Sequence, residues 1–466
     1  MAPVSVAASD RENNGPPVSD SKSNGRRAGE EESSSPALRP VSLFDQILDF
    51  GSRADPYPLF AELRRTPVSR ADDGGYVVST YAEITALLHD PRISSEIRNR
   101  SDHEALTRDE PAGLPPAFIG LDPPEHDRVR RLLMRHFGPP HSPGRITGLI
   151  PEITAITGGL IDRLAGRGDA DLVADVTYPL PVAVICQLLG VPPEDEPRFR
   201  VWADAVVEAT DPATGDLTTR RSRRIKAATE LGAYLGELAD AHGRDPGDDI
   251  LSGLATDPEE QGRLTRAEVM VNAVLLLIAG HETTVNLIAN GMLTLLRHPD
   301  VLARLVREPG LAPRLVEELL RYEPPVQFLG NRVALDEIEV AGCTIPRGAP
   351  ITLALAAGNR DPGHLADPDR FDPDRPFIEH LGFGGGVHYC FGAPLARLEA
   401  QIALTELARR LANPRLVVDP PPYRPSPLLR GPRQLAVRFD GLAPARAADR
   451  WADRRPSPAR SVAAPR

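Results

Sequence analysis

Cysteine and aromatic residues are scarce in this chain of 466 residues. Only three cysteines occur, at unrelated spacings, and aromatic side chains make up 5% of the sequence. Disulfide frameworks and structural zinc sites need cysteines in pairs or at short ligand spacings, so we expect neither, and a reducing compartment is favoured. The core must be built mainly from aliphatic side chains.

Long apolar runs and a surplus of positive charge are also missing. The longest nearly unbroken apolar run, residues 273–279, is far shorter than the roughly 20 residues that span a bilayer. No signal-peptide core follows the first methionine. The formal net charge is -11, and lysine occurs only at Lys22 and Lys226. These features argue against a membrane span and against a general nucleic-acid binder, and they predict a cytoplasmic protein.

Composition divides the chain into a long patterned middle and two unpatterned ends. Residues 1–40 are rich in serine, glycine, proline and charge, and residues 441–466 are rich in alanine, proline and arginine. Both ends are predicted to be disordered, because such segments bury too little apolar surface to offset the entropy of ordering. No linker interrupts residues 41–440, which we predict to form one domain.

The apolar periodicity of this middle region is mostly helical, with strand patterns near its start and in its last third. Helices are expected over residues 57–65, 81–89, 151–164, 181–190, 195–210, 218–242, 265–296, 311–322 and 391–411. Strands are expected at 75–79, between 326 and 355, and between 415 and 439. Residues 91–124 lack periodicity, and so long an irregular segment usually serves a function. The predicted fold class is mostly α with small β sheets.

Residues 383–392 combine one thiol and one imidazole with several glycines. Glycines at this density let a loop lie against a large planar group without Cβ collisions. Pro394 then starts a predicted helix, so Cys390 lies just before a helix N-terminus, where amides and the dipole favour a thiolate. Such a thiolate suits haem iron when O–O cleavage is the task. Cys186 and Cys343 lack these surroundings, and we interpret them as small apolar residues.

A second motif lies in the middle of the predicted helix 265–296. Gly280 weakens the helix there, and the hydroxyl of Thr283 can compete for a backbone carbonyl one turn earlier. We therefore expect a local opening of the helix. Glu282 lies among apolar residues, where a carboxylate seldom lacks a partner or a purpose.

Together these motifs resemble those of the cytochrome P450 haem-thiolate monooxygenases. The family pattern Phe-x-x-Gly-x-His-x-Cys-x-Gly is filled by Phe383, Gly386, His388, Cys390 and Gly392. The family's acid-alcohol pattern is filled by Ala279, Gly280, Glu282 and Thr283. The resemblance covers roughly residues 43–440 and implies the cytochrome P450 fold with one b-type haem.

The resemblance also implies a role for each motif residue. Cys390 would be the axial ligand of the haem iron, and Glu282 and Thr283 would deliver the protons that O–O cleavage requires. Haem-binding residues would be His126, Arg130, Arg332, Phe383, Gly384, His388, Ala279 and Gly280. His126 and Arg130 are spaced to share one helix face, which suits a pair of haem propionates.

Further residues would support the site. By the same resemblance, Glu318 and Arg321 form a structural ion-pair network with Arg370 beneath residues 383–392, the cysteine loop. Residues 91–124 would cover the haem, and the helices predicted at 195–210 and 218–242 would form a lid. The side chains that face the substrate would be Val326, Phe328 and Leu329.

The implied activity is the O2-dependent hydroxylation or epoxidation of a hydrophobic small molecule, such as a terpenoid, macrolide or other secondary metabolite, or a fatty acid. Electrons would come from NAD(P)H through a separate reductase and a ferredoxin or flavodoxin, because the chain has no flavin or iron-sulfur motif. The patch that docks this partner would contain Arg128, Arg131, Arg135 and Arg397. Two alternatives stay open: a peroxide-driven or oxidative-coupling P450, and a non-catalytic haem-binding sensor. The Glu282–Thr283 pair favours O2 activation over both.

Overall fold

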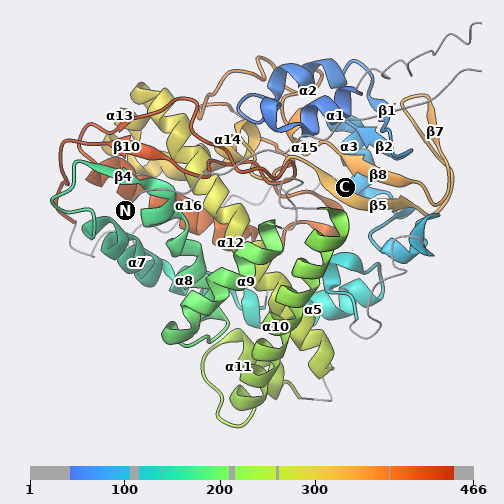
Figure 1. Ribbon diagram of the computed structural model, residues 1–466, viewed down its shortest axis with the longest axis horizontal. Helices are drawn as coiled ribbons and strands as arrows, with labels where there is room; N and C mark the ends of the chain where they lie inside the picture. The colour runs from blue at the N-terminus through green and yellow to red at the C-terminus, as the bar shows by residue number, and fades with distance from the viewer. Residues whose placement is uncertain are drawn as a thin grey trace, which may run out of the picture. The chain divides into compact units, whose positions relative to one another are not determined.

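The longest helix, α12 (Arg266–Arg297), runs through the middle of the protein (Figure 1). It begins at a capping box, in which the side chains of Thr265 and Glu268 each accept a hydrogen bond from the other's backbone N–H. By length and composition α12 could cross a membrane, but 61% of its most apolar 18-residue window is buried inside the protein. It is the core helix, close to the predicted range 265–296.

The computed structural model of the chain describes residues 42–104, 115–139, 141–208, 216–258, 262–376 and 378–445. The predicted tail 1–40 lies outside the described residues, and so do residues 446–466 of the other predicted tail.

Helices α8 (Pro179–Leu188), α10 (Leu217–His242), α14 (Ala312–Tyr322) and α16 (Ala393–Arg410) pack on α12. The contacts are aliphatic, as the scarcity of aromatic residues predicts, and the largest core cluster joins these helices. The remaining helices are α1 (Leu43–Leu48), α2 (Tyr57–Leu63), α3 (Tyr81–His89), α5 (Glu125–Phe137), α6 (Pro143–Gly148), α7 (Ile150–Asp162), α9 (Glu196–Glu208), α11 (Ile250–Thr256), α13 (Pro299–Arg307) and α15 (Leu355–Gly358).

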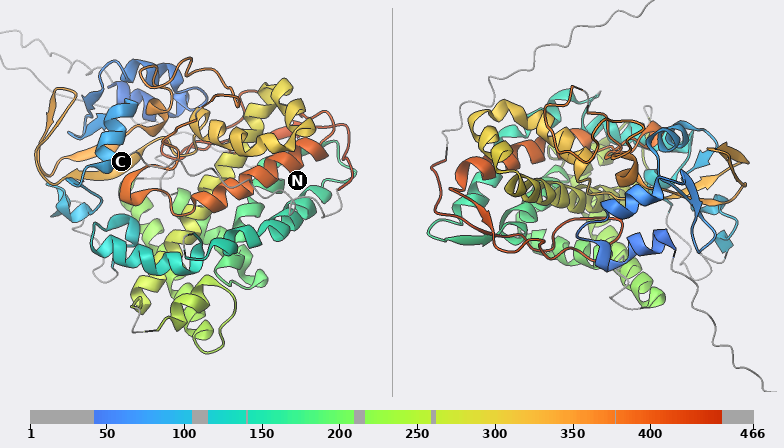
Figure 2. Two further views of the ribbon diagram at one scale, coloured as in Figure 1. Left: turned by 180° about the vertical axis from the view of Figure 1, so that it is seen from behind. Right: turned by 90° about the horizontal axis from the view of Figure 1, so that it is seen from above.

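The strands form three small sheets. The five-stranded sheet has the order β1-β2-β8-β5-β3, the three-stranded sheet has the order β4-β10-β9, and β6 pairs with β7. The first two sheets lie at opposite ends of the helical layer (Figures 1 and 2). The strands are β1 (Val68–Arg70), β2 (Tyr76–Val78), β3 (Ile93–Ser94), β4 (Asp169–Asp171), β5 (Leu329–Ala334), β6 (Ile338–Val340), β7 (Cys343–Ile345), β8 (Pro350–Leu353), β9 (Arg415–Leu416) and β10 (Ala436–Arg438).

The five-stranded sheet brings distant segments together beside the cysteine loop. Its β2 and β8 run parallel, with Val78 opposite Leu353, while β5 pairs antiparallel with both β8 and β3. One face packs on α3 through a second core cluster. Register in β5 shifts between Leu329 and Arg332, which alters the side-chain alternation at this point. The predicted fold class, mostly α with small β sheets, is confirmed.

Candidate active site

The cysteine loop, residues 383–392, packs against the C-terminal end of α3 and leads into α16. Gly384 and Gly386 have φ angles of +66° and +62°, which favour glycine. At Gly386 a Cβ would lie 2.0 Å from the carbonyl oxygen of Leu88, so a side chain at position 386 would force the loop away from α3. The backbone N–H of Cys390 donates to the carbonyl oxygen of Phe383 at 3.0 Å, which closes the loop. Cys390 lies just before α16, as predicted.

Opposing effects act on the Cys390 thiol. Burial raises its pKa, whereas the backbone N–H groups of Gly392 and Ala393 and the charge of Arg130 lower it. The helix N-terminus thus supplies the predicted amide donors, but burial outweighs them. A coordinating metal ion would reverse this balance, because it deprotonates a bound thiol.

A cavity of about 240 Å³ separates the cysteine loop from α12. Besides Cys390 and the loop glycines, it is lined mostly by apolar side chains of α12, of the 3₁₀ turn Phe118–Gly120 and of the chain around Val326. Phe383, Gly384, Ala279, Gly280 and Thr283 all line it. The structure therefore brings the two main sequence motifs to opposite walls of one cavity.

Cations gather on one edge of this cavity without acidic partners. Arg130 of α5 and Arg332 of β5 line it, and no carboxylate of the described residues forms an ion pair with either. Burial lowers the pKa of Arg332 to about 10. The ring of His388 lies 4.4 Å from that of His126, and burial together with the charges of Arg332, His126 and Arg130 lowers the pKa of His388 to about 3. Such an edge attracts an anion.

The two histidines of this edge each keep one ring nitrogen free for a ligand. His388 Nε2 bonds the Ser95 hydroxyl at 2.8 Å, while its Nδ1 is buried and has no hydrogen-bond partner among the residues that the structure describes. His126 Nδ1 bonds Asp127 at 2.8 Å, and its Nε2 is likewise buried and unpartnered. Buried polar atoms are nearly always hydrogen-bonded in native proteins. Orphaned nitrogens beside unpaired arginines fit the carboxylates of a haem, and the apolar walls fit its ring.

On the opposite wall, the acid and the alcohol of α12 point in different directions. Thr283 lines the cavity, and its hydroxyl donates to the carbonyl oxygen of Ala279 at 2.7 Å. Glu282 is buried but does not line the cavity, and its Oε1 lies 2.9 Å from Nη1 of Arg424. Burial raises the pKa of Glu282, against the attraction of Arg424. The predicted opening of the helix is not seen, because α12 is a continuous α-helix through residues 279–284.

A further carboxyl, which sequence reasoning missed, belongs to Glu399 of α16. It lines the cavity, is fully buried, and its Oε2 has no hydrogen-bond partner. Burial alone raises the pKa of Glu399 from 4.5 to about 8. A helical position C-terminal to Cys390 was the only sequence signal that could have indicated this residue.

Beneath the cysteine loop, a buried ion-pair network joins α14 to the chain that follows it. Arg321 donates two hydrogen bonds to the Glu318 carboxylate, from Nε at 2.7 Å and from Nη2 at 2.8 Å. Arg375 completes the network, with Nε 3.3 Å from Glu318 Oε1. The prediction that the Arg370 side chain is the third member was wrong, because that side chain is 69% exposed and pairs with Asp372. Only its carbonyl oxygen belongs to the network, where it accepts from Arg321 and Arg375.

The network reaches the cysteine loop through Asn359 and α16. Arg321 donates to the carbonyl oxygen of Asn359, whose side chain accepts from the backbone N–H of Leu381 at 2.6 Å. Glu317 of α14 pairs with Arg397 of α16 at 2.7 Å, and these bonds lower the pKa of Glu317 to about 2 against the effect of its burial. Both links hold the two ends of the cysteine loop against α14.

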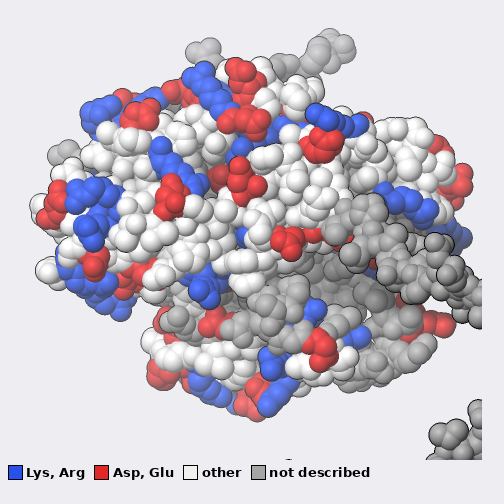
Figure 3. Space-filling view, turned by 45° about the horizontal axis from the view of Figure 1, so that its top comes forward, with Lys and Arg blue, Asp and Glu red and all other residues white. Residues whose placement is uncertain are grey.

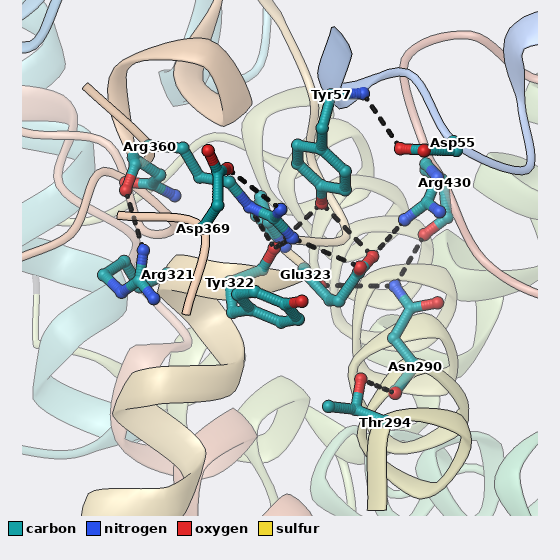
Figure 4. A network of polar contacts seen from close by, with 12 residues as sticks. Asp55, Tyr57, Asn290, Thr294, Arg321, Tyr322, Glu323, Arg360, Asp369 and Arg430 are labelled. Carbon is teal, nitrogen blue, oxygen red and sulfur yellow. Dashed lines mark hydrogen bonds and ion pairs between the residues drawn. The ribbon is translucent and has the colours of Figure 1, made fainter. Parts of the chain in front are cut away.

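A second buried network ties the N-terminal helices to the end of α14 (Figure 4). Glu323 pairs with Arg360 at 3.4 Å and also with Arg430, and the hydroxyl of Tyr57 donates to the carbonyl oxygen of Tyr322 at 2.9 Å. The guanidinium of Arg360 lies over the rings of both tyrosines. Every arginine of this network has an acidic partner.

The three predicted substrate-facing residues separate into two groups. Val326 and Leu329 line the cavity, whereas Phe328 does not. Its ring packs instead against Phe44 and Phe60, in a core cluster beneath α1 and α2. Of the three residues only Leu329 belongs to β5, so the irregular backbone before this strand, and not strand alternation, turns the Phe328 ring away from the cavity. Residues 105–114 of the predicted haem-covering segment lie outside the described residues, and the rest contains β3 and 3₁₀ turns.

Comparisons with known proteins agree with this geometry. The family model described as Cytochrome P450 matches residues 229–309 and 310–436. Cytochrome P450 monooxygenase PikC from Streptomyces venezuelae is 41% identical over 411 residues, which cover 84% of this chain and 94% of PikC. The 6-deoxyerythronolide B hydroxylase from Saccharopolyspora erythraea is 36% identical over 409 residues, which cover 83% of this chain and 96% of that enzyme. The solved structure of ligand-free CYP164A2 from Mycobacterium smegmatis has a TM-score of 0.78 and 41% identity, and the match covers 85% of this chain and 99% of that chain.

Proposed function

The chain belongs to the cytochrome P450 family and is a P450 monooxygenase with the fold of that family, and on this premise we propose how its residues serve the reaction. The family implies a b-type haem. We assign Cys390 as the iron ligand, and Arg130, Arg332, His126 and His388 as the residues that hold the haem carboxylates. One observation carries this assignment: a buried thiol and a set of unpaired cations line the same apolar cavity.

The haem, once bound, supplies the activation of O2. Thr283 and Thr284 both line the cavity on that wall, and we assign Thr283, the hydroxyl of the acid-alcohol pair, as the proton donor. Glu282, the residue before Thr283, lies on the side of α12 away from the cavity, and it replaces the proton that Thr283 gives up. Phe383, Gly384, Ala279 and Gly280 shape the flat space between the two walls.

The substrate is a neutral, hydrophobic small molecule. Among the described residues that line the cavity, the ionisable side chains other than Cys390 are those assigned to the haem carboxylates and Glu399. The remaining wall is almost entirely apolar, with Val326 and Leu329 on the side of β5. Relatives named for the oxidation of 6-deoxyerythronolide B, mycinamicin IV and vitamin D3 support a secondary metabolite or a lipid as the substrate.

The electrons come from NAD(P)H through a ferredoxin or flavodoxin and its reductase, and the enzyme acts in the cytoplasm as the single domain 41–440. Cations and acids are interspersed over the face shown in Figure 3. Two arginines of the predicted docking patch are already paired within the chain, Arg397 with Glu317 and Arg128 with Glu125. Arg131 is exposed and forms the better docking contact. Its replacement should slow electron transfer most at low salt.

Two measurements test the proposed activity. Optical titration of the ferric protein against 6-deoxyerythronolide B, mycinamicin IV, vitamin D3, corticosterone, myristic acid and econazole identifies compounds that enter the cavity. Turnover of such a compound under ¹⁸O2 with a surrogate ferredoxin and reductase should then place one labelled oxygen atom in the product. Turnover with hydrogen peroxide but not with the reductase would instead favour the peroxide-driven alternative.

A further inference from the structure

A stripe of buried polar residues follows one side of the core helix α12. Glu282, Asn286 and Asn290 are spaced by four, so they share one face of the helix, and each is at most 2% exposed. This face meets the C-terminal hairpin, residues 423–432, in which Tyr423 pairs with Pro432 and the backbone N–H of Arg424 donates to Gly431. None of these three residues lines the cavity.

The hairpin contacts this stripe at three levels. The side-chain amide of Asn290 donates to the carbonyl oxygen of Arg430 at 2.9 Å. One turn earlier, Gly431 approaches Asn286 so closely that a Cβ at position 431 would lie 2.2 Å from Asn286 Oδ1. At the level of Glu282, the guanidinium of Arg424 reaches across from the hairpin. Since Arg430 is itself anchored by Glu323, the position of Arg424 is determined by the rigid part of the protein.

Arg424 separates Glu282 from solvent. The Glu282 side chain is 2% exposed and that of Arg424 is 15% exposed, with 2.9 Å between Oε1 and Nη1. The buried side-chain amide of Asn286, one turn further along the helix, lies beside the Glu282 carboxyl group and lowers its pKa. An amide offers both a donor and an acceptor, so it can bond a neighbouring carboxyl group in either protonation state.

Other charged and titratable groups around Glu282 come from α9 and from the start of α8. Asp204 of α9 raises the pKa of Glu282, and it accepts a hydrogen bond from the hydroxyl of Tyr178 at 2.8 Å. The ring of Tyr178 packs edge-on against His281, the residue before Glu282, at 4.5 Å between centroids. Burial and Asp204 therefore favour the protonated carboxyl, and Arg424 opposes them.

We propose that Arg424 is the positioning residue of the proton relay: its guanidinium favours the ionised form of the Glu282 carboxyl group and turns it toward the C-terminal hairpin, away from the cavity wall that carries Thr283. This inference rests on the proposed function, and it adds the side from which protons arrive. Because Arg424 stays protonated, it does not carry the proton itself. Protons reach Glu282 along the seam between α12 and the hairpin, where Asn286 can bond either form of the acid.

The test is infrared spectroscopy of the ferric holoenzyme as a function of pH. Four proteins are compared: the parent, Arg424→Met, Arg424→Lys and Arg433→Met, the last being a matched control because Arg433 is exposed on the same segment. Each spectrum is subtracted from that of the same protein carrying Glu282→Gln. This subtraction isolates the protonated-carboxyl band of Glu282 from that of Glu399.

In Arg424→Met the Glu282 band should persist to a pH about 1 to 3 units higher than in the parent, since an adjacent opposite charge shifts a carboxyl pKa by this amount. Arg424→Lys should restore most of the parental titration, and Arg433→Met should match the parent. An unchanged titration in Arg424→Met, or an equal shift in Arg433→Met, would overturn the proposal. The reduced, carbon-monoxide-treated spectrum should keep its thiolate band in every variant; loss of that band in the parent itself would contradict the proposed function instead.

Discussion

Two sets of buried arginines differ in one respect. Beneath the cysteine loop and around Tyr57, Arg321, Arg375, Arg360 and Arg430 all lie within ion-pair distance of a glutamate. At the cavity edge Arg332 is buried and Arg130 half-buried, and no carboxylate of the described residues forms an ion pair with either, although Asp122 and Asp127 act on them from a greater distance. The first set is complete within the chain. The second set carries positive charge that no ion pair within the described residues neutralises.

This difference separates scaffold from binding site. A buried charge costs several kcal/mol unless it is paired, so a chain keeps an unpaired one only where a ligand completes it. The same contrast applies to the buried carboxyls. Glu282 has Arg424 as a partner, while Glu399 has none, and its pKa is raised to about 8. The predictions below test this division, from the largest effect to the smallest.

The scaffold should fail when one of its paired arginines is removed. Replacing Arg375 by methionine leaves Glu318 with Arg321 as its remaining ion-pair partner and frees the backbone carbonyls of Ala366 and Asp367, so we expect a loss of about 3 to 5 kcal/mol in the free energy of unfolding. Urea unfolding of the holoenzyme measures it. The matched control is Arg370→Met, because that side chain is exposed, and it should stay within about 0.5 kcal/mol of the parent. If both variants lost the same free energy of unfolding, the Arg370 side chain would belong to the network after all.

The cavity edge should respond in the opposite way. Replacing Arg332 by methionine should leave the apoprotein as stable as the parent, since no internal ion pair is broken. It should weaken haem retention by about 1.5 to 3 kcal/mol, the worth of a hydrogen bond to a charged group, or roughly ten- to a hundredfold in the rate of haem transfer to a scavenger protein. Arg347→Met, at an exposed position after β7, is the control. Unaltered haem transfer in the Arg332 variant would remove that residue from the site.

Glu399 predicts a pH dependence of stability. Because its pKa rises from 4.5 to about 8 on folding, the folded state keeps a proton between these values that the unfolded state has lost. Stability should therefore fall as pH rises through this window, by up to about 1.4 kcal/mol per pH unit from this group. Glu399→Gln should remove that slope, and it should be more stable than the parent at pH 8 but not at pH 5. Parallel profiles in urea unfolding would refute the prediction.

The smallest effects are expected at Val326 and Phe328, where substitution should alter ligand binding at the first residue and stability at the second. Val326→Phe fills part of the cavity and should weaken econazole binding in an optical titration, with little change in stability. Phe328→Leu should instead cost about 1 kcal/mol of stability and leave econazole binding unchanged, because its ring packs against Phe44 and Phe60. A reversal of the two outcomes would place Phe328 at the cavity.

Local motifs were predictable because their chemistry lies within a few residues. The glycines before Cys390, the helix after it and the long apolar helix 265–296 are each read from adjacent positions, and all appear in the structure. The pairing of Glu282 with Arg424 was not predictable, since it depends on the path of the C-terminal hairpin.

The errors share this cause. Arg370 and Arg375 belong to one irregular segment, and only its fold decides which side chain turns inward. Phe328 lies between two cavity residues in sequence, but the irregular chain before β5 turns its ring into the core cluster beneath α1 and α2. Glu399 resembles any charged residue of an amphipathic helix until α16 is packed. Sequence patterns thus located the walls of the site, and tertiary packing determined which side chains face it.

The central claim is that the sulfur of Cys390 holds the iron of a haem in this cavity. The most direct measurement is the absorption spectrum of the reduced protein under carbon monoxide, for the parent and for Cys390→Ala. We predict the red-shifted band of thiolate ligation in the parent and its loss in the variant. A parent without that band, or a variant that retains it, would contradict the account.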